Sequence, residues 1–193
     1  MDIKELVIKN RSCRGYDKGY KVSRDELLQL VDCARLTAAS MSLQPLKYML
    51  VTAGETADIV NANVKFAAQL PEENLPYEGE EPEAFVLVCQ DLEINDNPER
   101  FMKDVGIVAQ TITLKATEMG LAGCMIGNYN KTKLATELGL DSRYLIQLVI
   151  SIGKSVEDIR IVEINPDESP LYYRKDGVHY VPKRKLDDII CGQ

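Results

Sequence analysis

The 193-residue chain carries 45% hydrophobic and 27% charged residues, proportions that are ordinary for a soluble globular protein. Its formal net charge of -7 argues against non-specific binding of nucleic acid, because the phosphates would be repelled. The length suits one domain over residues 1–193, with no signal peptide and no apolar run of membrane-spanning length. Five cysteines without disulfide-framework spacing predict free thiols and a cytoplasmic protein.

Side chains able to perform catalysis unaided are scarce. There is no CxxC pair, and His179 is the single histidine, so a metal site built from Cys and His is not expected. A Ser-His-Asp or Cys-His site would have to use His179, which lies in an alternating, strand-like run. We therefore expect no metal site and no catalytic side chain.

The N-terminal stretch predicts a short helix over residues 2–9, followed by a basic motif. Arg11 and Arg14 are three residues apart, so both guanidiniums share one face if the turn stays helical. Such a pair can hold a phosphate, although a solvated basic patch is the more frequent meaning of this spacing. The apolar residues expected to face inward from the helix are Ile3, Leu6 and Val7.

A capping box opens the second predicted helix. Ser23 and Glu26 have the spacing at which each side chain bonds the backbone N–H of the other, and the helix continues to about Ala34. Small and hydroxylated residues then lead to Pro45. This composition suits a loop over residues 38–45 that lies flat against another surface.

Strand and helix signals alternate through the middle of the chain. Residues 46–52 predict a strand, Gly54 begins a helix that extends to about residue 70, and residues 84–90 form the continuous apolar run of a buried strand. Between this helix and the strand at 84–90, residues 71–82 are acidic and interrupted by prolines. We expect an exposed loop or lid there.

The segment from Pro98 to Gly120 predicts the central helix. At about 100° per residue, its apolar residues form two faces, with Ile107 and Leu114 opposite the main stripe. Such a helix must be covered on both sides, either within one large core or by a second subunit. The main stripe consists of Val105, Val108, Ala109, Ile112, Ala116 and Met119.

Glycines follow the central helix, and helix and strand signals then return. Residues 120–127 predict a Gly-rich turn whose backbone can approach a ligand closely. Asn130 caps a short helix that Gly139 ends, and residues 145–153 and 159–164 predict strands. Helices that alternate with few strands indicate an α/β or α+β fold around a small sheet.

Nucleotide-binding fingerprints are absent. The glycines at 120–127 do not form GxGxxG and follow a helix, so they are not a Rossmann motif, and GxxxxGK[ST] does not occur. Basic residues near both ends of the chain, a flat loop of small residues and a Gly-rich turn suit a phosphorylated cofactor instead. In such a protein the cofactor carries the reaction and the chain positions it.

Four motifs occur in order along most of the chain. They are Arg11-Ser12-x-Arg14-x-Tyr16; Ala38-Ala39-Ser40-Met41-Ser42-x-Gln44-Pro45; Asp104-x-Gly106-x3-Gln110 with Gly120-Leu121-x-Gly123-Cys124-x-Ile126-Gly127; and Asp176-Gly177-Val178-His179-x-Val181-Pro182-Lys183-Arg184. Together they resemble the FMN-dependent nitroreductase family. The resemblance implies an α+β three-layer sandwich with a central, mostly antiparallel sheet flanked by helices. It also implies an obligate homodimer with two FMN molecules at the subunit interface.

The resemblance further implies roles for individual residues. The FMN phosphate and ribityl chain would be held by Arg11, Ser12, Arg14, Lys183 and Arg184. The flavin ring would lie along Ala39, Ser40 and Ser42 of the partner subunit, in a loop that Gln44 helps to position. The opposite side of the flavin would face Gly123, Cys124 and Met125, whose backbone would donate to the ring edge.

The flat loop departs from the family pattern. Ser42 stands where the family usually carries Asn, and its shorter side chain would contact the flavin through water. Many members also have Pro and Ser where this chain has Ala38 and Ala39.

The implied activity is that of a ping-pong oxidoreductase. NADH or NADPH would give hydride to FMN, leave, and be replaced by an electron-poor acceptor such as a nitroaromatic or a quinone. Backbone N–H groups and cations would stabilise the anionic reduced flavin. Two alternatives stay open: another chemistry of the same scaffold, such as dehalogenation or desaturation, and a dimeric flavin-binding module without turnover.

Overall fold

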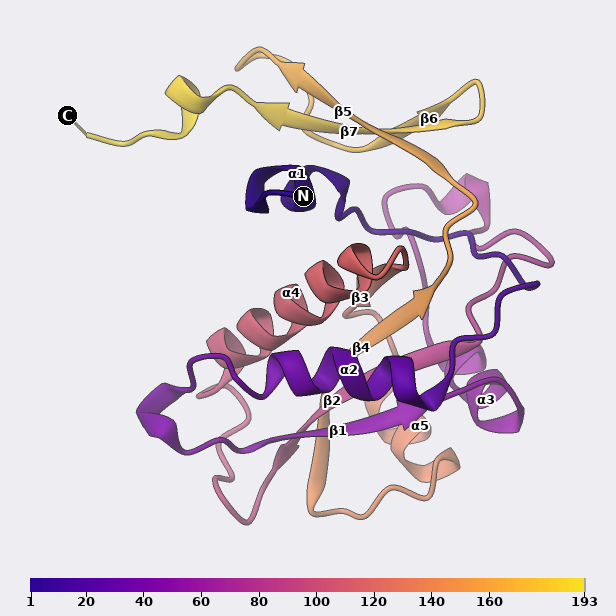
Figure 1. Cartoon of the computed structure of the whole chain (residues 1–193), viewed down its shortest axis with the longest axis vertical. Helices are drawn as coiled ribbons and strands as arrows, with labels where there is room; N and C mark the ends of the chain where they lie inside the picture. The colour runs from indigo at the N-terminus through magenta and orange to yellow at the C-terminus, as the bar shows by residue number, and fades with distance from the viewer. Residues whose placement is uncertain (193) are drawn as a thin grey trace.

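A four-stranded sheet forms the centre of the fold, and helices cover both of its faces (Figure 1). The computed structural model describes residues 1–192. The strand order is β1-β2-β4-β3, and each neighbouring pair is antiparallel. The strands are β1 (Leu46–Val51), β2 (Ala84–Asp91), β3 (Ala122–Ile126) and β4 (Tyr144–Gly153).

The second strand shows why three layers form. Successive side chains of a strand point to opposite faces, so Val86 and Val88 join one apolar cluster while Phe85 and Leu87 join the other. Helices cover both clusters, which buries all of β2 and accounts for its unbroken apolar run. The predicted α+β sandwich is confirmed. One face carries α2 (Arg24–Ala34) and α4 (Met102–Glu118), and the other α3 (Glu55–Asn63) and α5 (Lys131–Glu137).

A smaller sheet lies apart from the central one (Figure 1). Its order is β5-β7-β6, with β5 parallel to β7 and β6 antiparallel to it. Figure 1 shows the helix α1 (Ile3–Lys9) between this sheet and α4, against which α1 packs. The strands are β5 (Asp158–Ile164), β6 (Tyr173–Lys175) and β7 (Val178–Arg184).

The burial predicted for α1 is wrong within a single chain. Ile3 is 68% exposed and Val7 is 41% exposed, and of the three residues predicted to face inward only Leu6 is half-buried. This seven-residue helix packs against α4, and within residues 1–192 the side chains of Ile3 and Val7 stay exposed.

Two helix boundaries differ from the prediction because tertiary hydrogen bonds compete with the helix. α3 ends at Asn63 rather than near residue 70, since the backbone N–H of Lys65 donates to the carbonyl oxygen of Asn128. α4 begins at Met102 rather than at Pro98. The carbonyl oxygen of Pro98, which a helix would use, instead accepts a hydrogen bond from the side chain of Gln147.

The stretch predicted as a Gly-rich turn is mostly a strand. Gly120, with φ of 78°, ends α4 and reverses the chain, as predicted. Residues 122–126 then pair with β4 as the edge strand β3. Gly123 is buried in this strand, where a Cβ atom would lie 3.0 Å from the carbonyl oxygen of Ser151. The glycine therefore serves close packing within a sheet rather than a turn.

α4 has the two faces that its sequence predicts. Val105, Val108, Ala109, Ile112 and Ala116 are buried in the core, and Met119 packs against it half-buried. On the other side Ile107 is 41% exposed and Leu114 is half-buried, so the described residues cover this apolar face only in part. Within residues 1–192, no helix is both long and apolar enough to cross a lipid bilayer.

Candidate functional site

The segment that carries Arg11 and Arg14 is fixed against the edge strand of the central sheet. Ser12 forms a parallel bridge with Gly123, and the backbone N–H of Cys13 donates to the carbonyl oxygen of Gly123 at 3.1 Å. Two of the four sequence motifs, whose bridged residues are 111 positions apart in the chain, therefore meet side by side.

Tyr16 anchors the end of this segment. Its hydroxyl donates to the carbonyl oxygen of Cys13 at 2.8 Å and lies 2.7 Å from Oγ of Ser151. The side chain is buried, which raises the pKa of its hydroxyl well above the ordinary value and keeps it a hydrogen-bond donor. The ring lies directly against Gly153, where an added Cβ would come within 2.6 Å of Cδ1 of Tyr16.

Arg14 does not point into solvent. Its side chain is buried, and its guanidinium carbon lies 4.6 Å from the centre of the Tyr172 ring, in cation–π geometry. Nη1 lies 3.3 Å from both the carbonyl oxygen of Ser12 and Nε2 of His179. Among the described residues, nothing accepts a hydrogen bond from its Nε. The solvated-patch alternative therefore does not apply to Arg14.

His179 is neutral beside Arg14. Burial, together with the positive charges of Arg14 and Arg174, lowers the pKa of its imidazole to about 4. A guanidinium only donates, so Nε2 accepts and the ring proton belongs on Nδ1. This Nδ1–H finds no acceptor within residues 1–192.

Acid is expected to destabilise the protein through His179. The unfolded imidazole takes up a proton near pH 6.5, whereas the folded one does so only near pH 4. Between these pH values the unfolded state binds more protons than the folded state does. The stability that the neutral His179 contributes above pH 6.5 is therefore lost as the pH falls. From pH 7 to pH 5 this amounts to about 2 kcal/mol in the free energy of unfolding. Denaturant titrations at both pH values would measure it.

His179→Gln supplies the comparison for that measurement. The variant removes the titrating group, so its unfolding free energy should fall less than that of the wild type over the same interval. Equal losses in the two proteins would mean that His179 contributes nothing to the pH dependence.

Arg11 lies beside α1 and not on one helical face with Arg14, because residues 10–15 are extended rather than helical. Its Nη2 donates to the carbonyl oxygen of Val7 at 2.7 Å. Partial burial lowers the pKa of its guanidinium below the ordinary value. Its Nε is buried and has no acceptor among the described residues. Arg11 and Arg14 thus each keep a buried N–H available to an acceptor.

The C-terminal cations lie further along β7. Lys183 and Arg184 are exposed, and Nη1 of Arg184 donates to the carbonyl oxygen of Pro166 at 3.2 Å. Arg14 contacts β7 at His179. His179 precedes Arg184 by five residues, which corresponds to roughly 16 Å along a strand. Arg14 and Arg184 therefore contact β7 at different places along its length.

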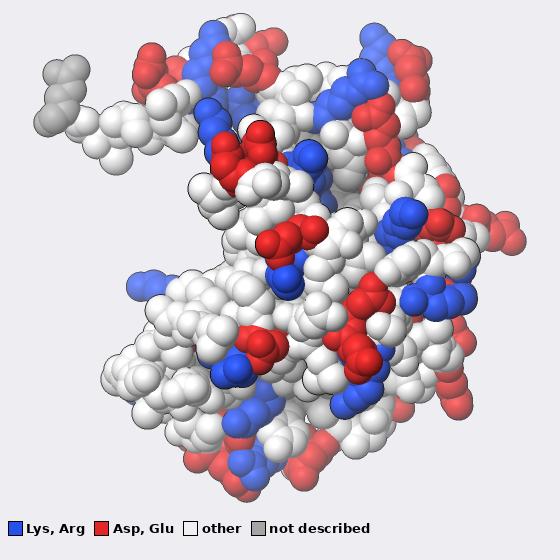
Figure 2. All heavy atoms as spheres, viewed as in Figure 1, with Lys and Arg blue, Asp and Glu red and all other residues white. Residues whose placement is uncertain are grey.

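The flat loop lies at the other end of the molecule. Residues 38–45 lie near the start of α4, where Ser40 bonds Asp104, whereas Ser12 pairs with Gly123 just beyond the end of α4, so one chain does not bring these motifs together (Figure 1). Figure 2 shows no Lys, Arg, Asp or Glu on the surface of this loop. The backbone N–H and hydroxyl of Ser40 both donate to the carboxylate of Asp104, at 2.8 and 2.5 Å. Gln44 reaches back to the carbonyl oxygen of Ser42 at 3.4 Å.

The β3 residues predicted to face the cofactor differ in exposure. Gly123 and Cys124 are buried, whereas Met125 is 37% exposed. Burial raises the pKa of the Cys124 thiol, so this side chain stays protonated and is a poor nucleophile. Only the backbone of β3 is available as a donor at this edge.

The family is decided by a direct comparison with known proteins. The nitroreductase family model matches residues 7–154. The chain belongs to the nitroreductase family. It is 26% identical over 188 residues to the oxygen-insensitive NADPH nitroreductase of Helicobacter acinonychis, covering 80% of this chain and 88% of that protein.

Solved structures share the nitroreductase fold at lower identity. A protein from Exiguobacterium sibiricum, solved in complex with FMN, has a TM-score of 0.68 and 23% identity, covering 81% of this chain and 90% of that one. CLA-ER, an enone reductase of gut-bacterial fatty acid metabolism, has a TM-score of 0.69 and 18% identity, covering 86% of this chain and 94% of that one.

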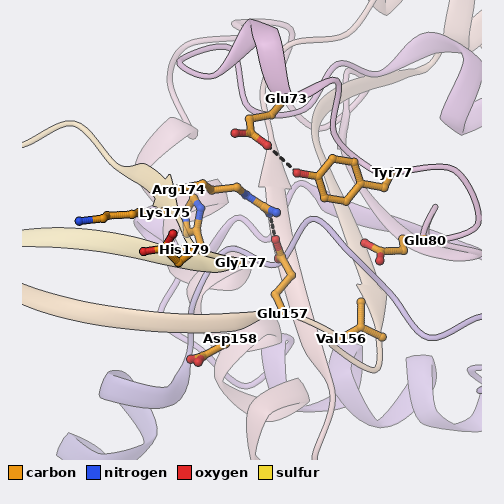
Figure 3. Close-up of a pocket in the computed structure, with 11 residues that line it drawn as sticks. Glu73, Tyr77, Glu80, Val156, Glu157, Asp158, Arg174, Lys175, Gly177 and His179 are labelled. Carbon is orange, nitrogen blue, oxygen red and sulfur yellow. Dashed lines mark hydrogen bonds and ion pairs between the residues drawn. The ribbon is translucent and has the colours of Figure 1, made fainter.

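This member of the nitroreductase family has a cavity of about 270 Å³ beside His179 (Figure 3). The acidic segment forms one wall through Glu73 and Tyr77, whose hydroxyl donates to Glu73 at 2.5 Å. Arg174 forms another wall, pairs with Glu157 and lies 5.5 Å from the Tyr77 ring. Glu157 also accepts the backbone N–H of Arg14 at 2.5 Å. The predicted exposed loop is also tied directly to the segment that carries Arg14, because the backbone N–H of Tyr16 donates to the carbonyl oxygen of Glu80 at 2.9 Å.

Four residues that were not among the predicted cofactor-binding residues help to shape this candidate site. Glu157 fixes the backbone of Arg14, Tyr172 and His179 pack on its guanidinium, and Asp104 holds the flat loop. The sequence Asp176-Gly177 was one available signal, because it marks a tight hairpin turn and so places the residues around it side by side.

Proposed function

We propose that the chain is an FMN-dependent oxidoreductase that uses NADH or NADPH to reduce electron-poor acceptors such as nitroaromatics and quinones. The observation that carries the proposal is the fixed segment beside β3, in which Arg11 and Arg14 each have a buried N–H that no residue of 1–192 accepts. The name of the Helicobacter relative, an NADPH nitroreductase, and the FMN complex of the Exiguobacterium protein support it.

The residues present fit FMN. A phosphate dianion and the oxygen-rich ribityl chain would satisfy the buried guanidinium donors, which otherwise leave polar groups unpaired. Arg11 and Ser12 are adjacent in the chain, and the guanidinium of Arg14 is held by His179 and Tyr172. Because Arg14 contacts β7 at His179, roughly 16 Å along the strand from Arg184, we assign Arg184 and Lys183 to the phosphate and Arg14 to the part nearer the ring.

When bound, FMN supplies hydride transfer between the nicotinamide nucleotide and the acceptor. The chain's own contribution is to bind and orient the cofactor. Backbone N–H groups of Gly123 to Met125 at the sheet edge and the positive charge of Arg14 stabilise negative charge on the ring. No side chain is required to move a proton, which agrees with the high pKa of the Cys124 thiol and the low pKa of the His179 imidazole.

We further propose that the site is completed by a second copy of the chain. The flat loop and the Arg11–Arg14 segment of one protomer lie at opposite ends of α4, so the ring-facing loop would come from the partner subunit. Large apolar side chains that one chain leaves exposed on α1, α4 and the loop support an interface. They are Ile3, Val7, Met41, Leu43, Met102 and Ile107. Residues 1–193 would act as one domain in this dimer. Five free thiols support a reducing, cytoplasmic setting.

Anaerobic reduction tests this function. Protein loaded with FMN is mixed with NADH or NADPH, and the absorbance of the bound flavin is followed; a nitroaromatic, a quinone, an enone or a halogenated acceptor is then added. We expect one nucleotide to bleach the flavin and a nitroaromatic or a quinone to restore its colour. Bleaching restored by the enone or halogenated compound alone would assign another chemistry of the fold. Bound flavin that neither nucleotide bleaches would indicate a flavin-binding module without turnover.

A further inference from the structure

The flat loop between α2 and β1 has a strained backbone. Met41, Ser42 and Gln44 have φ values of 52°, 57° and 49°, in the left-handed region that side-chain-bearing residues avoid. Three such residues within four positions persist only where the surroundings over-determine the conformation. The loop therefore needs a specific restraint.

Asp104 supplies that restraint. It lies in the first turn of α4 and is 3% exposed, and its two carboxylate oxygens accept the backbone N–H and the hydroxyl of Ser40. Other side-chain contacts of the loop are weaker: the amide of Gln44 reaches Ser42 at 3.4 Å, and Arg100 reaches the sulfur of Met41 at 3.5 Å. Charge-assisted hydrogen bonds to a buried carboxylate are the strongest of these interactions.

Packing does not explain the loop conformation. A cavity of about 70 Å³ separates the loop from the helices behind it, and Ala39, Gln44, Asp104 and Val108 are among the residues that line it. The loop is thus held at Ser40 by a polar contact and is incompletely supported by apolar side chains.

We propose that Asp104 is a positioning residue, which fixes the loop in the one conformation that fits the flavin ring of the partner subunit. The proposal rests on the proposed function. Because the hydroxyl of Ser40 is already committed to Asp104, Ser40 acts by being held and not by donating its hydroxyl to the flavin. The backbone of Ala39 to Ser42 then forms the surface presented to the ring.

A merely structural role predicts different behaviour. An acidic residue in the first turn stabilises a helix through its dipole, and losing it would lower stability without changing the environment of a bound flavin. Asp25 provides the matched control, since it lies in the first turn of α2 and is exposed, at the end of that helix away from the loop. Asp25→Asn therefore removes the same charge without touching the loop.

The experiment compares Asp104→Asn, Ser40→Ala, Ser40→Thr, the Asp104→Asn/Ser40→Ala double variant and Asp25→Asn. FMN affinity is measured by titration, and the environment of the bound flavin by its visible circular dichroism. Asp104→Asn is expected to weaken FMN binding roughly tenfold to a hundredfold and to change the flavin spectrum. Ser40→Ala should do the same to a smaller degree, because the backbone bond to Asp104 remains. Ser40→Thr keeps the hydroxyl and should behave like the wild type.

The double variant and the control decide the interpretation. Ser40→Ala should cause no further loss once Asp104 is replaced, and Asp25→Asn should leave affinity and spectrum unchanged. A folded Asp104→Asn protein with wild-type affinity and spectrum would overturn the proposal. If Asp104→Asn does not fold, the Ser40→Ala and Ser40→Thr pair decides, and equal behaviour of those two would overturn it.

A last readout needs no cofactor. Arg35 is exposed just before the loop, so trypsin cleavage after Arg35 in FMN-free protein reports loop mobility. Asp104→Asn should be cleaved faster than the wild type and Asp25→Asn should not; equal rates in all three would contradict the restraint. Wild-type protein that takes up no FMN would overturn the proposed function, and faster cleavage would then show the restraint without the cofactor role.

Discussion

Replacing Arg11 and Arg14 together by glutamine is expected to give a folded protein that has lost most of its FMN. Each guanidinium offers the cofactor at least one buried N–H that no described residue accepts. A charge-assisted hydrogen bond contributes about 1.5–3 kcal/mol. Loss of both should therefore weaken FMN binding by roughly two to four orders of magnitude. Titration with FMN, monitored by flavin fluorescence, measures the effect.

Arg160→Gln is the matched control for the loss of charge. Arg160 is exposed on β5 and pairs with Asp158, away from the segment beside β3. This variant should bind FMN like the wild type. Unfolding curves must show that the Arg11/Arg14 double variant still folds cooperatively, because Arg14 is buried against Tyr172. Wild-type FMN affinity in the folded double variant would contradict the assignment of both arginines.

Gly153→Ala is expected to destabilise the protein by about 3 kcal/mol, a large effect for one methyl group. The added Cβ would lie 2.6 Å from Cδ1 and 3.2 Å from Cγ of Tyr16, far inside van der Waals contact. Tyr16 cannot swing away freely, because its hydroxyl is bonded to Cys13 and Ser151 in the interior. The segment that carries Arg14 must shift with it, so FMN affinity should fall together with stability. Urea unfolding and FMN titration measure both.

Gly127→Ala serves as the control for stability alone. Its Cβ would meet no atom within 4 Å, and its φ lies outside the left-handed region. We expect its unfolding free energy to stay within about 0.5 kcal/mol of the wild type. A Gly153→Ala protein as stable as the wild type would show that Tyr16 is not tightly held, and the anchoring of the site segment would need another explanation.

The sequence predicted correctly those helix ends and strands that are determined by residues close to them in the chain. The capping box of Ser23 and Glu26 begins α2 as expected, and the left-handed Gly120 and Gly139 follow the ends of α4 and α5. The unbroken apolar run of β2 predicted burial on both faces. In each case the deciding residues lie within a few positions of the feature that they determine.

Predictions failed where residues far away in the sequence determine the secondary structure. The start of α4 depends on Gln147, which takes the carbonyl of Pro98 from 49 positions away. The glycine in residues 122–126 favoured a turn when the sequence was considered alone. These residues form a strand, β3, because they pair with β4. Both outcomes come from tertiary hydrogen bonds, which no local pattern in the sequence records.

The candidate site shows the same division. The motifs indicated Arg11, Arg14 and Gly123, and the fold brings the first two alongside the third. The surroundings of Arg14 come from His179, 165 positions later, and were not predictable from spacing. The proposed function of the flat loop depends on a partner subunit, for which the apolar pattern of one chain offers the second apolar face of α4.

Sedimentation velocity of FMN-loaded protein, recorded at a flavin absorption wavelength and at a protein wavelength, tests the central claim most directly. The account predicts one species with the mass of two chains that carries all of the bound flavin, with about one FMN per chain. A species with the mass of one chain that retains tightly bound FMN would contradict the shared site. A flavin-free monomer after incubation with FMN would contradict both the cofactor and the dimer.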